Sequence, residues 1–64
     1  MSTREEQFER MLSDVQQRYA DTVTKMEALK AQNKTKSATF RQLMGDKLLY
    51  QNMLTLYRIY GLTE

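Results

Sequence analysis

The segment Leu48–Tyr60 constrains the fold most, because nine of its thirteen residues are apolar or aromatic. At about 100° per residue, this segment and its extension back to Phe40 present two adjacent apolar ridges, which together cover roughly 160° of a helix. Ridge one contains Leu43, Tyr50, Leu54 and Tyr57, and ridge two contains Leu49, Met53, Leu56 and Tyr60. A helix that packs on one neighbour needs a stripe only somewhat wider than ~100°. This segment is therefore predicted to be a helix with two partners.

A strand is the competing interpretation of a short apolar run, but the segment does not alternate and is rich in Leu, Met and Gln, which favour helix. Thr39 and Gln42 match a capping box, which predicts that Thr39 caps the helix. Gly61 follows the last turn of this helix, at a position where the backbone commonly adopts a left-handed conformation. The predicted helix runs from about residue 39 to 60. Gly45 marks either a close helix contact or a break, because glycine costs up to ~1 kcal/mol in a helix interior.

The N-terminal half predicts a longer helix, from about residue 3 to 32. Thr3 and Glu6 form a capping box at its start. Steps of four and three then separate the residues of a heptad seam. The seam contains Phe8, Leu12, Val15, Tyr19, Thr22, Met26 and Leu29. This pattern fits the antiparallel seam of a hairpin. A parallel coiled-coil dimer is the alternative, which Tyr19 and Thr22 disfavour because they suit a tight two-stranded core poorly.

Residues 33–38 are polar and short enough to connect two packed helices. We therefore predict an all-α fold in which residues 1–64 form one antiparallel two-helix hairpin. A chain of 64 residues is small for a single core, and without cysteine it has no disulfide to stabilise it. Oligomerisation is the remaining source of stability, so we predict a homodimer that forms a four-helix bundle. Its predicted interface is ridge two: Leu49, Met53, Leu56 and Tyr60.

The residue inventory argues against catalysis and against a metal. The chain has no histidine and no cysteine, which are the commonest acid–base and metal-binding side chains at neutral pH. Most carboxylates lie on the outward side of the first predicted helix, and no glycine-rich phosphate loop is present. We expect no catalytic residue, no metal, no cofactor and no small-molecule substrate.

Two features suggest nucleic-acid binding as an alternative function. Lys34, Lys36 and Arg41 surround the predicted start of the second helix, where free amides and the helix dipole attract anions. These three residues form a candidate anion or nucleic-acid site. Alternatively, a turn at Gly45 would create a helix-turn-helix with Lys47–Tyr60 as its recognition helix. The main expectation is a non-enzymatic interaction, adaptor or regulatory module that binds itself and an unidentified protein partner.

The chain begins with polar and charged residues where a signal peptide would carry its apolar region. The thirteen-residue apolar run is too short, and too interrupted by polar residues, to span a bilayer. We therefore expect a soluble, cytoplasmic protein without a membrane partner. The net charge of +2 is too small to indicate a class of partner.

Overall fold

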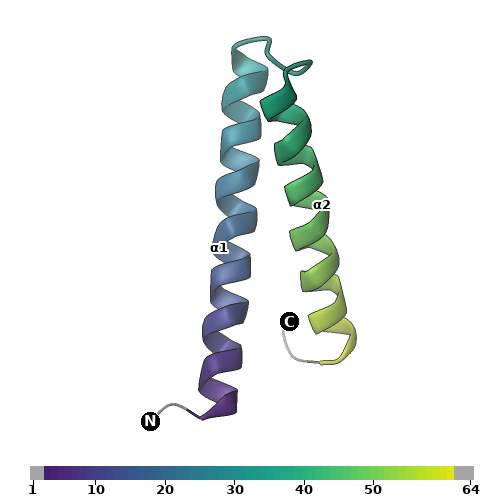
Figure 1. Ribbon diagram of the computed structural model, residues 1–64. Helices are drawn as coiled ribbons and strands as arrows, with labels where there is room; N and C mark the ends of the chain where they lie inside the picture. Colours follow the sequence, from purple (N-terminus) through teal and green to yellow (C-terminus); the bar gives the residue numbers. More distant parts are fainter. Residues whose placement is uncertain (1–2, 62–64) are drawn as a thin grey trace.

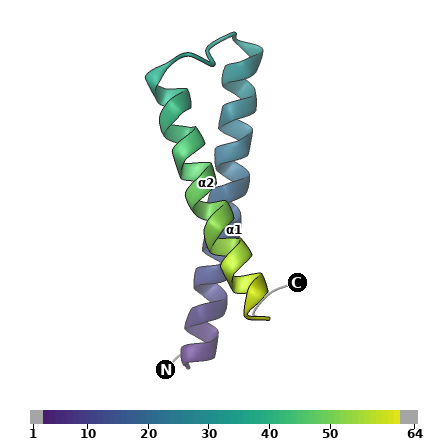
Figure 2. The same ribbon diagram turned by 90° about the vertical axis from the view of Figure 1, so that its right-hand side faces the viewer.

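The computed structural model describes residues 3–61, which form two helices joined by a short connector (Figure 1). Helix α1 spans Arg4–Ala31 and helix α2 spans Ala38–Ile59. The helices run antiparallel, and α1 extends past α2 at the end away from the connector (Figures 1 and 2). The prediction of an all-α helical hairpin is confirmed. The molecule is elongated, with extents of 45 × 25 × 17 Å.

Helix α1 begins and packs as its sequence predicts. The Thr3 hydroxyl accepts a hydrogen bond from the Glu6 amide at 3.1 Å, so the predicted N-cap is confirmed. Val15, Thr22 and Met26 are buried, and the other four seam residues are half-buried. Thr22 is tolerated among apolar neighbours because its hydroxyl donates to the carbonyl of Arg18, four residues earlier, at 2.7 Å. The predicted seam is therefore the face that α1 turns toward α2.

The chain leaves α1 through a left-handed turn at Asn33, whose φ is 57°. The Lys34 amide donates to the Leu29 carbonyl at 2.8 Å, and the Asn33 amide donates to the Lys30 carbonyl at 3.0 Å. This pair of bonds is the Schellman motif, which satisfies the last carbonyls of a helix. Asparagine enters the left-handed region more readily than most residues, so the reversal begins at Asn33.

The predicted N-cap of the second helix is wrong by two residues. Helix α2 begins at Ala38, and its cap is Ser37 rather than Thr39. The Ser37 hydroxyl accepts from the Phe40 amide at 3.1 Å and donates to the Lys34 carbonyl at 2.8 Å. Both residue types can cap a helix. The connector decides between them, because only the Ser37 hydroxyl bonds to both the connector and the first turn.

Replacing Ser37 by alanine should therefore destabilise the hairpin by about 1 kcal/mol, because the Phe40 amide loses its partner. Thr39→Ala is the matched control and should change stability by less than about 0.5 kcal/mol, as exposed positions do. Urea unfolding followed by circular dichroism measures both. An equal loss in the two variants would contradict the assigned cap.

Helix α2 is continuous through Gly45, so the hypothesis of a helix-turn-helix broken at this residue is wrong. A Cβ atom added to Gly45 would meet no other group within 4 Å. The hairpin therefore does not itself require a small residue at this position. Gly61 has the predicted left-handed conformation, with φ of 72°, and its amide donates to the Arg58 carbonyl at 3.0 Å.

The core between the helices is small. Phe40 and Val15 are each 4% exposed and Met26 is 7% exposed. Near the open end, Phe8 of α1 packs edge to face against Tyr57 of α2, with ring centroids 5.4 Å apart and an interplanar angle of 81°. This geometry is a favoured aromatic arrangement. Within residues 3–61, the core thus joins one side of each helix and leaves the other side of α2 uncovered.

Candidate functional site

The largest uncovered apolar area of the described chain lies on α2. Every residue of ridge one is half-buried toward α1. Met11 is the one large exposed hydrophobic residue from α1. The others, which we call the outer surface of α2, are Met44, Leu48, Leu49, Leu56, Ile59 and Tyr60. Their exposed fractions range from 44% for Met44 to 72% for Tyr60. An apolar face of this kind requires an explanation, because isolated apolar residues are common on surfaces but contiguous patches are not.

The four residues predicted for the dimer interface differ in their exposure. Leu49, Leu56 and Tyr60 are exposed on the single hairpin, whereas Met53 is half-buried at the edge toward α1. Leu48 and Ile59 are also exposed, by 54% and 71%. The uncovered surface is therefore wider than ridge two. The sequence already indicated the wider surface, because Leu48 and Ile59 lie outside the arc of the two predicted ridges.

The hairpin also exposes more surface than a folded monomer of its size. Its accessible area is 5321 Å², whereas folded monomers of 7.6 kDa expose about 4,300 Å². The difference, about 1,000 Å², is similar to the ~800 Å² that each partner buries in a standard protein interface. The radius of gyration is 14.3 Å, against about 11 Å for a compact domain of this length.

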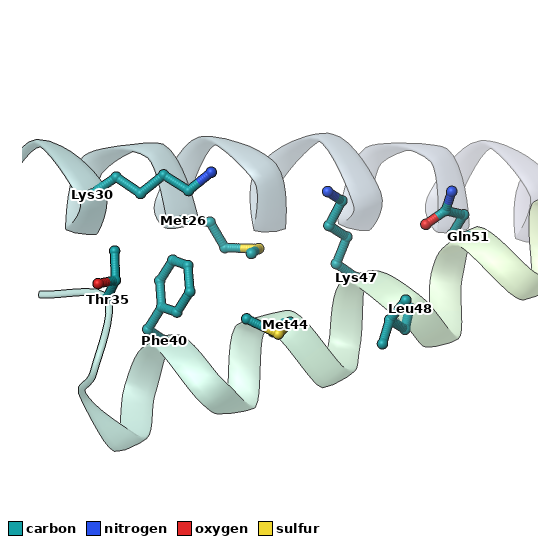
Figure 3. A pocket seen from close by; sticks show the side chains of 8 residues that line it. All are labelled: Met26, Lys30, Thr35, Phe40, Met44, Lys47, Leu48 and Gln51. Atoms are coloured by element: carbon teal, nitrogen blue, oxygen red, sulfur yellow. The ribbon is translucent and has the colours of Figure 1, made fainter.

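A shallow, open groove lies between the helices near the connector, with a volume of ≈ 500 Å³. Figure 3 shows Met26 and Phe40 facing each other across it, with the side chains of Lys30 and Lys47 on either side of Met26. No carboxylate of residues 3–61 lines this groove. The lining residues are Met26, Lys30, Thr35, Phe40, Met44, Lys47, Leu48 and Gln51. Met44 and Leu48 also belong to the outer surface of α2, so the groove and that surface adjoin.

The predicted anion-binding residues gather at the connector end of the hairpin. Lys34 and Lys36 lie in the connector, Arg41 lies in the first turn of α2, and all three are exposed. We call residues 30–47 the tip; it holds five basic groups and one acidic group, Asp46. The Ser37 hydroxyl is already engaged with the Phe40 amide. Lys34, Lys36 and Arg41 do not line the groove described above, so these three residues form a concentration of positive charge rather than a preformed pocket.

One ion pair lies on α1 within residues 3–61. Arg18 Nε donates to Asp14 Oδ2 at 2.7 Å, and both side chains are 59% exposed. The hydrogen bond to the Asp14 carboxylate is the main reason why the pKa of Arg18 is raised. Arg18 therefore stays charged at every working pH. Exposed pairs of this kind contribute little stability.

Within the described residues, no cluster of three or more acidic side chains is arranged to hold a metal ion. Neither helix combines the length and the apolar character needed to cross a membrane. Comparison of the chain with family models, curated proteins and solved structures finds no match.

Proposed function

We propose that this protein is a non-enzymatic interaction module that self-associates through the outer surface of α2 into a four-helix-bundle dimer. The observation that supports this most is the gathering of six large exposed apolar residues on one helix and its C-cap. Patches of this kind on soluble proteins mark interaction sites. If two hairpins packed together through this surface, ridge two of each chain would contact a helix of the other chain.

A second copy of the chain is the partner that best explains the small core. Only three apolar residues of the described chain are buried, and none of them is less than 2% exposed. Natural domains of this size often gain stability from disulfides, metals or oligomerisation, and the sequence has no cysteine. A two-fold dimer would use the same patch on both chains. Burial of Leu49, Leu56 and Tyr60 would then add to a core that is otherwise marginal.

The dimer would leave the polar outer side of α1 and the basic residues Lys34, Lys36 and Arg41 of the tip open to other molecules. In this proposal, the protein acts as an adaptor or regulator that presents two copies of each surface to a protein partner. The concentration dependence of thermal unfolding tests self-association, because a dimer melts at a higher temperature when its concentration rises. The proposal requires the melting temperature to increase between low and high micromolar protein. A melting temperature independent of concentration would contradict it.

The tip supports a second candidate function, binding to a nucleic-acid backbone. Lys34, Lys36 and Arg41 are exposed at one end of the molecule, in a segment with five basic groups and one acidic group. A dimer would carry two such tips. Phosphate contacts from lysine and arginine release counterions, so this binding would weaken steeply as salt increases.

Removal of the tip charges tests this candidate. The variant Lys34→Ser, Lys36→Ser, Arg41→Gln should fold normally, with less than about 0.5 kcal/mol change per site, and should lose RNA or DNA binding at low salt. A control that removes three cations elsewhere, Arg4→Gln, Arg10→Gln, Lys25→Ser, should keep most of the binding. Fluorescence anisotropy across a salt series measures both. Equal loss in the two variants, or no binding by the wild type, would rule out a tip-specific site.

A further inference from the structure

Gly45 has no structural explanation within a single hairpin. It lies in the interior of α2, which is continuous around it, and glycine weakens a helix at such a position. It does not have a positive φ. An added Cβ would meet no other group of residues 3–61 within 4 Å, so α1 does not approach it closely. The space above Gly45 is therefore free for another molecule.

Gly45 belongs to a row of exposed residues on α2, outside the contact with α1. Steps of four, three, four and three residues join the members of this row, which places them along one stripe of a helix. All five are exposed. The row contains Gly45, Leu49, Asn52, Leu56 and Ile59. One end of the stripe therefore carries no side chain, and the other end carries Ile59 beside Tyr60, which are 71% and 72% exposed.

Resting on the self-association proposed above, we infer that α2 of one chain packs antiparallel against α2 of a second copy, with each Gly45 receiving the partner's Leu56–Tyr60 segment. The row has its centre near Asn52, so antiparallel packing of the two α2 helices places Gly45 of one chain opposite Leu56–Tyr60 of the other. The large residues of each chain then fill the space above the other chain's glycine. A parallel pair would instead set Gly45 against Gly45 and leave a gap, which close-packed interfaces avoid.

The charge distribution independently favours the same orientation. The tip carries a net charge of +4, from five basic groups and one acidic group. The opposite end, residues 3–14 together with 50–61, carries three basic and four acidic groups, a net charge of −1. A parallel dimer would place two tips of +4 side by side. An antiparallel dimer places each tip beside the partner's slightly acidic end, and unlike charges attract.

The orientation can be measured directly, since the wild-type chain has no cysteine. A spin label on Lys36→Cys lies sixteen residues from the centre of the row. At 1.5 Å per residue, the two labels of an antiparallel dimer should be about 48 Å apart. Electron–electron resonance that gives this distance supports the inference. A label separation of about 20 Å or less would overturn it, while the dimer itself would remain.

The role of Gly45 is tested by adding side chains to it. Gly45→Ala should weaken the dimer about tenfold, and Gly45→Leu more strongly, because both overfill a packed contact. The matched background is Leu56→Glu, which is designed not to associate. There, Gly45→Ala should increase the helical circular-dichroism signal, as alanine favours helix over glycine. An unchanged or tighter dimer for both Gly45 variants would overturn the inference. A monomeric wild type would overturn the proposed self-association as well, and sedimentation distinguishes these two results.

Discussion

Replacing Leu56 by glutamate should convert the dimer into separate chains. Leu56 is 51% exposed on the single hairpin, so a carboxylate there remains solvated and disturbs few contacts of the monomer. In the proposed interface, the same carboxylate would be buried without a partner on both chains. A buried unpaired charge costs about 3–5 kcal/mol, so the dissociation constant should rise more than a hundredfold. Sedimentation equilibrium at tens of micromolar protein measures the change in mass.

The matched control for Leu56→Glu is Gln16→Glu, which adds the same charge at an exposed position on the outer side of α1. This control should remain a dimer with nearly unchanged stability. Met53→Glu is a less direct test, because Met53 is half-buried against its own hairpin and its replacement would disturb both interfaces. If Leu56→Glu sedimented as the wild type does, the outer surface of α2 would not be the dimer interface.

Replacing Phe40 by alanine should unfold much of the hairpin. Phe40 is 4% exposed and faces Met26 between the helices (Figure 3). Phenylalanine-to-alanine substitutions in cores cost about 3–5 kcal/mol, from lost transfer free energy and from the cavity. This loss is a large part of the stability of any small domain. Thermal unfolding followed by circular dichroism should show a strongly reduced melting temperature.

Phe40→Leu provides the control for this prediction. It retains most of the apolar volume and should cost clearly less than Phe40→Ala, since the remaining cavity is smaller. A Phe40→Ala protein that melts within a few degrees of the wild type would mean that Phe40 is not the main contact between the helices near the tip.

The parts of the fold that follow from local pattern could be predicted from the sequence. The seam of α1 contains seven regularly spaced residues, and this long pattern correctly predicted the face that α2 covers. The Thr3 cap and the left-handed Gly61 also follow from short motifs with a direct physical cause. Even Thr22, an unusual seam residue, occupies the predicted face, because its hydroxyl bonds to the Arg18 carbonyl.

The features that depend on tertiary geometry could not be predicted in the same way. Ser37 and Thr39 both fit a helix cap, and the choice depends on the position of the Lys34 carbonyl after the Asn33 turn. The role of Gly45 was ambiguous, because a glycine within a helical pattern is compatible with a break in the helix and with a close helix contact. The division of α2 into covered and uncovered residues was predicted in outline, but the half-burial of Met53 depends on the direction from which α1 approaches.

The mass of the wild-type protein in solution tests the central claim most directly. The proposal predicts that sedimentation equilibrium at micromolar concentration gives twice the chain mass of 7.6 kDa, with helicity falling as the protein is diluted and the chains separate. A stable, fully helical species of 7.6 kDa over the same concentration range would contradict self-association through α2.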